Sequence, residues 1–211
     1  VKNTNDIKLQ KFIWLTMAFG ANSTKSFKVY SKFGDINKAY STNDYDMEGI
    51  TDEQMCKLLD KRLEGAFEVL KKCKVLGIRV LCIEDEGYPD KLRAIADPPL
   101  VLYCKGKAVN FDESFCIGMV GTRSISDYGF KTAKYLAEGA AAAGAVVVSG
   151  LAKGIDAACQ RSALNAGGLT VGVIGNSIDT VYPKENAALF NKLYSYGLVI
   201  SEYWPGCITN K

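Results

Sequence analysis

Apolar side chains recur with the period of a helix before residue 77. Between residues 63 and 76 they lie three or four positions apart, as on one face of an amphipathic helix: Leu63, Ala66, Phe67, Leu70, Cys73 and Leu76. Thr51 and the polar residues after it are typical of a helix start, and residues 22–24 and 33–35 are typical of turns between helices. We therefore predict a small all-helical domain over residues 1–76.

Beyond Gly77 the pattern changes to short runs rich in β-branched residues. These runs predict strands at 78–83, 100–104, 115–120, 145–149, 170–174 and 198–201. From residue 115 onward helical segments separate the strands, at about 127–143, 155–167 and 185–195. Such alternation is typical of βαβ units. We therefore predict an α/β fold with a doubly wound, mainly parallel sheet over residues 77–211.

Charge and composition exclude several classes of protein. The 211 residues include 26 basic and 23 acidic side chains, a net charge of +3, so bulk charge indicates no partner. The chain contains no histidine, which excludes Ser-His-Asp triads, Cys-His pairs and histidine-ligated metals. The seven cysteines have no C-x-x-C spacing, and no apolar run approaches the ~18 residues of a membrane span. We expect a cytoplasmic protein with reduced thiols, no metal site and no membrane contact.

Three successive strands each lead into a glycine-containing turn before a helix. The turn residues that we expect to form a binding site are Gly121, Thr122, Arg123, Ser149, Gly150, Lys153, Gly154 and Gly175. The carboxyl ends of parallel strands share one edge of the sheet, where such folds bind ligands. Glycine lets a ligand approach the backbone, helix N-termini attract anions, and Arg123 and Lys153 can pair with phosphate. The pattern predicts an anion-binding site at this edge.

Common nucleotide motifs and catalytic groups are missing from the sequence. It contains neither a G-x-x-x-x-G-K-[ST] motif nor a G-x-G-x-x-G motif with an acidic residue ending the next strand, which argues against P-loop NTPases and NAD sites. Ser149 has no histidine to activate it, and Asp156 has the position of a first-turn helix residue. Tyr203 and Trp204 are compatible with stacking on bases and equally with packing in a core or interface. We expect no catalytic residue and no cofactor.

Five segments carry a family resemblance: YPDKLRAIADPPLVLYCKG at 88–106, VGTRSISDYG at 120–129, SGLAKGIDAACQRSALNAGG at 149–168, VIGNSIDTVYPKEN at 173–186 and SEYWPG at 201–206. In these segments the chain resembles the DNA-processing protein A family, called DprA or Smf. The resemblance implies a Rossmann-like fold preceded by a sterile-alpha-motif-like helical domain. It also implies a homodimeric protein, not an enzyme, that binds and protects incoming single-stranded DNA and helps to load the RecA recombinase in natural transformation. In the family's motifs Arg123 and Lys153 occupy phosphate-contacting positions.

The chain also departs from the family pattern. Cys159 stands where the family usually has a histidine, and the family usually has a second glycine near Ser177. The family continues beyond Lys211, so we expect residues 77–211 to be a C-terminally incomplete domain whose dimer and RecA surfaces lie mostly in the missing part.

Two alternatives stay open. One is a nucleotide-binding enzyme or sensor of a related Rossmann-like superfamily. That class typically has a Gly-Gly-x-Gly-Thr loop, and the residues after Gly167 and Gly168 do not complete this motif. In the other, the helical region before residue 77 serves as a docking module for a partner, a role that nothing in its sequence separates from structural support.

Overall fold

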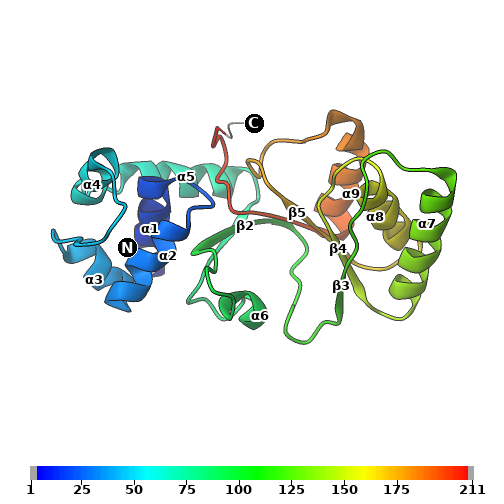
Figure 1. Ribbon diagram of the computed structural model, residues 1–211, viewed down its shortest axis with the longest axis horizontal. Coiled ribbons are helices and arrows are strands. Elements are labelled where there is room, and N and C mark those ends of the chain that lie inside the picture. The colour runs from blue at the N-terminus through cyan, green and yellow to red at the C-terminus, as the bar shows by residue number, and fades with distance from the viewer. Residues whose placement is uncertain (1–3, 209–211) are drawn as a thin grey trace. The chain divides into compact units, whose positions relative to one another are not determined.

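Helices α1 to α5 occupy the first part of the chain in the computed structural model, which describes residues 4–208 (Figure 1). Their bounds are Thr4–Phe19 (α1), Thr24–Phe33 (α2), Ile36–Ser41 (α3), Asp52–Leu59 (α4) and Glu64–Val75 (α5). Thr51 and Gln54 form a capping box at the start of α4, and the Asp35 side chain accepts hydrogen bonds from the first turn of α3. The helices expected before residue 77 are therefore present.

The chain divides into two compact units, residues 1–102 and residues 103–211. Besides the helices, the first unit holds β1 (Arg79–Cys82) and the short α6 (Asp90–Arg93). The domain boundary predicted between residues 76 and 77, and the likeness of the helices to a sterile alpha motif, stay predictions.

Helix α1 supplies much of the core of the first unit. Its Phe12 and Leu15 side chains are fully buried. Polar contacts connect α1 and α2 to the segment after β1, because the Glu84 carboxylate accepts a hydrogen bond from the Tyr30 hydroxyl at 2.8 Å and pairs with the Lys8 ammonium at 2.5 Å. The hydrogen bond that Lys8 donates to Glu84 raises the pKa of Lys8 above its ordinary value.

The strands form one six-stranded sheet in the order β1-β2-β6-β5-β4-β3. The other strands are β2 (Val101–Gly106), β3 (Cys116–Gly118), β4 (Val146–Ser149), β5 (Thr170–Ile174) and β6 (Leu198–Ser201). Strands β3, β4, β5 and β6 are parallel and adjacent in chain order, whereas β2 pairs antiparallel with β6. This mixed, mostly parallel sheet confirms the predicted α/β, Rossmann-like fold class.

Three long helices connect the parallel strands of the second unit. They are α7 (Asp127–Ala142), α8 (Ile155–Asn165) and α9 (Ala187–Tyr196), the last preceded by a short 3-10 helix, η1 (Lys184–Asn186). Helices α7 and α8 pack together through small side chains, among them Ala137 and Ala163, over Val147 of β4. Cys159 lies in this cluster and is buried, and burial raises the pKa of its thiol. The residue that stands where the resemblance leads us to expect a histidine is therefore part of the packing between helices.

Candidate nucleic-acid interface

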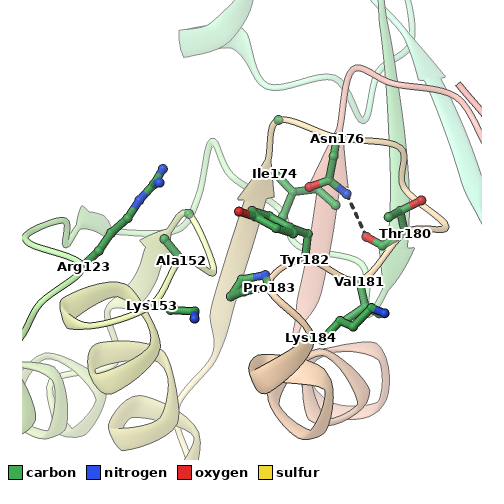
Figure 2. Close-up of a pocket in the computed structure, with 12 residues that line it drawn as sticks. Arg123, Ala152, Lys153, Ile174, Asn176, Thr180, Val181, Tyr182, Pro183 and Lys184 are labelled. Carbon is green, nitrogen blue, oxygen red and sulfur yellow. Dashed lines mark hydrogen bonds between the residues drawn. The ribbon is translucent and has the colours of Figure 1, made fainter. Parts of the chain in front are cut away.

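Three loops follow β3, β4 and β5 at the same edge of the sheet. Because these strands are parallel and in register, their carboxyl ends bring together the loops 119–126, 150–154 and 175–183. The loops surround a cavity of about 520 Å³ that is lined mostly by apolar atoms. Figure 2 shows Arg123 and Lys153 on one side of it and Tyr182 from the third loop beside them.

The first two loops are in direct backbone contact. The N–H of Ile155, at the start of α8, donates to the Thr122 carbonyl at 3.1 Å. Gly154 has a φ of +81°, and a Cβ at this position would lie 2.2 Å from the Thr122 carbonyl oxygen. A Cβ at Gly121 would lie 2.6 Å from Cγ1 of Ile155. These two glycines therefore serve the close approach of the loops to each other.

Ser149 and Gly150 position the second loop. The Ser149 hydroxyl is buried and donates to the Met119 carbonyl at 2.6 Å, which joins the ends of β3 and β4. The Gly150 N–H donates to the buried carboxylate of Asp156 at 3.1 Å. Asp156 thus accepts a loop hydrogen bond in addition to occupying the first turn of α8, which agrees with a structural role for this carboxylate.

Asn186 also holds the second loop in place. Its buried side-chain amide donates to the carbonyls of Leu151 and Ala152, at 2.9 and 3.1 Å. Arg161 on α8 donates to the amide oxygen of Asn186 at 2.9 Å and so fixes the orientation of the amide. Sequence reasoning did not single out Asn186, because it lies 34 positions from its partner Ala152 and belongs to no periodic pattern.

The third loop is held by the segment that follows β6. The Ser177 hydroxyl donates to the Trp204 carbonyl at 2.7 Å, and the Ser201 hydroxyl donates to the Asn176 carbonyl at 2.6 Å. The Asn176 amide in turn donates to the Thr180 carbonyl at 2.8 Å, as Figure 2 shows. Ser177, near which the resemblance leads us to expect a glycine, is therefore buried, and its hydroxyl supports the loop.

The cations at the cavity differ in the hydrogen bonds and ion pairs that they form within the protein. The Arg123 guanidinium is exposed and forms no hydrogen bond or ion pair with any residue between 4 and 208. Lys153 pairs with the exposed Glu185 carboxylate at 2.5 Å, and this hydrogen bond lowers the pKa of Glu185. Lys184 also lines the cavity, but its side chain extends away from Arg123 and Lys153 (Figure 2).

Gly175 and Tyr182 leave open space at the cavity. A Cβ at Gly175 would have no neighbouring atom within 4 Å, so the fold itself does not require glycine there. The Tyr182 side chain is 48% exposed, and its ring lies next to Ile174 in the close-up (Figure 2). A ligand can therefore approach the backbone at Gly175 and contact an aromatic ring in the same cavity.

The structure divides the eight predicted site residues into two groups. Four line the cavity: Arg123, Gly150, Lys153 and Gly175. The other four shape the surrounding loops: Gly121, Thr122, Ser149 and Gly154. Sequence reasoning did not identify Asn176, Tyr182 or Lys184 as lining residues.

Two further findings concern residues 4–208 as a whole. No group of three or more His, Cys, Asp or Glu side chains in this range is arranged to hold a metal ion. No helix in this range combines the length and the apolar character that crossing a membrane requires.

The sequence and the fold both match known proteins. The sequence profile of the family described as DNA recombination-mediator protein A matches residues 79–211. DNA processing protein DprA from Bacillus subtilis is 36% identical over 137 residues, 65% of this chain and 46% of the relative. DprA from Streptococcus pneumoniae is 40% identical over 156 residues, 73% of this chain and 51% of the relative. The chain thus spans about half the length of these curated relatives.

Two solved structures share the fold. The crystal structure of DprA from Streptococcus pneumoniae aligns with a TM-score of 0.80 and 29% identity, and it covers 96% of this chain and 70% of that one. DprA from Helicobacter pylori, whose structure describes a single-stranded DNA binding mode, aligns with a TM-score of 0.57 and 31% identity over 64% of this chain and 59% of that one. Together with the profile match, they show that the chain belongs to the DNA recombination-mediator protein A family.

Proposed function

We propose that this chain binds single-stranded DNA, without catalysis, at the cavity between the three loops. The observation that carries the proposal is the position of two exposed cations, Arg123 and Lys153, beside an apolar cavity at the carboxyl edge of the sheet. The DprA of Helicobacter pylori, which shares the fold, binds single-stranded DNA. Cations next to apolar surface suit a polymer in which charged phosphates alternate with flat bases.

Each lining group has a distinct part in the proposed binding. Arg123 offers two parallel N–H donors to one phosphate, and it gives up no protein partner to do so. Lys153 exchanges the Glu185 carboxylate for a phosphate. The ring of Tyr182 and the open backbone at Gly175 take up an adjacent base. Bases in a duplex are stacked and paired, so only an unpaired strand presents them to such a cavity.

The proposal extends to the role of the whole protein. We propose that the full-length protein protects incoming single strands in the cytoplasm and helps to load the RecA recombinase during natural transformation. Because this chain spans about half the length of its curated relatives, the RecA contact and the homodimer are assigned to the full-length protein. Binding of DNA is assigned to the chain itself.

The test compares a fluorescent oligothymidylate of about 20 nucleotides with a duplex of equal length, by anisotropy at several salt concentrations. We expect tighter binding of the single strand. We expect Arg123→Ala and Lys153→Ala each to weaken it about 10-fold, as for the loss of one charge-assisted hydrogen bond. Lys192→Ala, which removes an exposed lysine of α9 outside the cavity, is the matched control.

Two outcomes would overturn the proposal. One is equal affinity for the single strand and the duplex, and the other is an unchanged affinity in both cavity variants. Thermal shift against a panel of mononucleotides covers the alternative of a nucleotide enzyme or sensor. A large stabilisation by one mononucleotide, with none by the oligonucleotide, would favour that alternative.

A further inference from the structure

The outer face of α7 presents an aromatic and basic stripe. Tyr128 and Tyr135 lie seven residues apart, with Lys131 between them, so the three side chains share one face of the helix. The tyrosines are 79% and 77% exposed. The buried side chains of α7, Ala133 and Ala137 among them, belong to the opposite face, which packs on α8 and β4.

The three side chains of the stripe have no side-chain partner between residues 4 and 208. Tyr128 and Tyr135 form no ring contact or hydrogen bond, and Lys131 forms no ion pair, with any part of the chain in that range. Tyr196, another exposed tyrosine of this unit, does have a partner, as Lys107 lies 5.9 Å from its ring centre. Large exposed apolar groups in a row are typical of a binding surface.

We propose that a single strand bound at the cavity continues along the outer face of α7, with bases stacked on Tyr128 and Tyr135 and a phosphate at Lys131. The inference rests on the proposed function. Helix α7 begins four residues after Arg123, so the stripe starts next to the phosphate site. The two rings are about 10 Å apart along the helix axis, which matches about three stacked nucleotides of one strand.

The chemistry of the stripe favours nucleic acid over a protein partner. The cores of protein interfaces are poor in lysine, whereas sites for single strands combine aromatic rings with cations. Lys131 alternates with the two rings, and a further lysine, Lys134, lies nearby on α7 in a weak pair with Glu138, 3.8 Å away. This alternation of ring and cation complements the alternation of base and phosphate.

The first experiment measures the affinity for oligothymidylates of about 6 and about 20 nucleotides, lengths that bracket one short site and a longer path. In Tyr128→Leu/Tyr135→Leu we expect the longer strand to bind roughly 10-fold or more weakly and the shorter strand to bind as in the parent. Tyr128→Phe/Tyr135→Phe keeps the rings and should retain the affinity for the longer strand. Tyr196→Leu, an exposed tyrosine of α9, is the matched control.

The second experiment locates the strand directly. Photo-crosslinking with a bromodeoxyuridine-substituted strand of the longer length, followed by trypsin, places Tyr128 in the peptide 124–131 and Tyr135 in the peptide 135–153. We expect crosslinks at Tyr128 and Tyr135 themselves, identified by fragmenting the two peptides, and their loss in the leucine variant. Crosslinks at Gly150 or Lys153, which share the second peptide with Tyr135, report on the cavity and should persist. Circular dichroism confirms that each variant is folded, and the phenylalanine pair serves as the folded test if the leucine pair is not.

The outcomes separate this inference from the proposed function. Unchanged affinity of the leucine pair for the longer strand, with affinity still lost in Arg123→Ala, would overturn the inference and leave the proposed function intact. Failure of the parent to bind either strand would overturn both. A change in sedimentation of the leucine pair without a change in DNA affinity would identify the stripe as a protein interface and would also overturn the inference.

Discussion

Cations serve different purposes in the two units of the molecule. In the helical unit the Lys61 ammonium lies 4.7 Å from the ring centre of Tyr45 and 5.0 Å from that of Trp14. It also donates to the Thr42 carbonyl at 2.8 Å and to the Tyr45 hydroxyl at 2.5 Å. Protein groups therefore surround this cation, and they stabilise the segment between α4 and α5.

At the cavity of the second unit the arrangement is reversed. Arg123 forms no hydrogen bond or ion pair with the residues that the structure describes, and Lys153 has one exposed carboxylate as its partner. Such cations contribute little to the stability of the fold, because exposed ion pairs are screened by water. A cation with its donors already used supports the fold, and one with free donors beside a cavity is available to a ligand.

The largest expected effect is a loss of DNA affinity at the cavity without a loss of stability. Arg123→Ala/Lys153→Ala is expected to lower the affinity for single strands about 100-fold, because two charge-assisted contacts are lost, while the Tm stays unchanged. The slope of log affinity against log salt should shrink by about 1.4, at ~0.7 for each phosphate contact. Lys28→Ala/Lys57→Ala removes the same charge from the helical unit, and an equal loss of affinity there would contradict the comparison.

The second prediction concerns Lys61, the cation that protein groups surround in the helical unit. Lys61→Ala should lower the free energy of unfolding by about 2 kcal/mol, through the loss of ring contacts and of two hydrogen bonds. DNA affinity should stay unchanged. Urea unfolding measures the first quantity, with Lys57→Ala as control, because within residues 4–208 Lys57 pairs only with the exposed Glu53 on the same helix. A Lys61 variant as stable as this control would show that the surrounding rings contribute nothing.

Gly175 tests whether the open backbone at the cavity is used by DNA. Gly175→Ala should weaken binding about 5-fold, because a methyl group there occupies the space of the ligand, with no change in Tm. Gly87→Ala is a suitable control, since a Cβ at that position meets only Leu81 at an ordinary distance of 3.8 Å. A lowered Tm with unchanged affinity would mean that Gly175 serves the fold instead.

Removing the charge of Glu185 should raise the affinity for single strands, whereas the cavity variants above lower it. Glu185→Gln removes the carboxylate that competes with phosphate for Lys153, so the affinity for single strands should rise about 2- to 3-fold, the range expected for an exposed ion pair. Anisotropy titration against the parent measures the change. In the Lys153→Ala background the same substitution should have a smaller effect, and an equal gain there would show that the ion pair is irrelevant.

A pH dependence is also expected in the helical unit. Burial lowers the pKa of Lys61 from 10.5 to about 8. Between these two values the unfolded chain binds more protons than the folded one, so the free energy of unfolding should rise with pH above about 8. Lys61→Met removes this contribution. Urea unfolding of both proteins between about pH 7.5 and 9.5 should show the steeper rise in the parent, and parallel curves would refute it.

Much of the fold could be predicted from local pattern. The predicted strands at 170–174 and 198–201 coincide with β5 and β6, because short runs without alternating polar residues suit strands that are covered on both faces. Helix α7 ends one residue before the predicted position. The antiparallel pairing of β2 with β6 could not be predicted, because the order of strands depends on contacts between distant segments.

The residue types of the candidate site could be predicted from the sequence. Which of them line the cavity and which hold the loops together could not. Arg123 and Lys153 were predicted as the cations of the strand-end turns, and both line the cavity. Gly154 and Ser149 were predicted beside them, yet one packs on the backbone of the first loop and the other donates to Met119. No local pattern distinguishes a glycine that admits a ligand from one that admits a neighbouring loop.

The sequence by itself determined which elements form and which edge of the sheet carries the glycine turns and cations, since hydrophobic periodicity and turn residues act over a few positions. The tertiary structure alone decided which of those groups are free. Arg123 is left to solvent, Lys153 pairs with Glu185 over 32 positions, and Asn186 holds the second loop through carbonyls 35 and 34 positions away. Partners so far apart in sequence meet only when the sheet is assembled, and the assembled contacts leave only some donors available to a ligand.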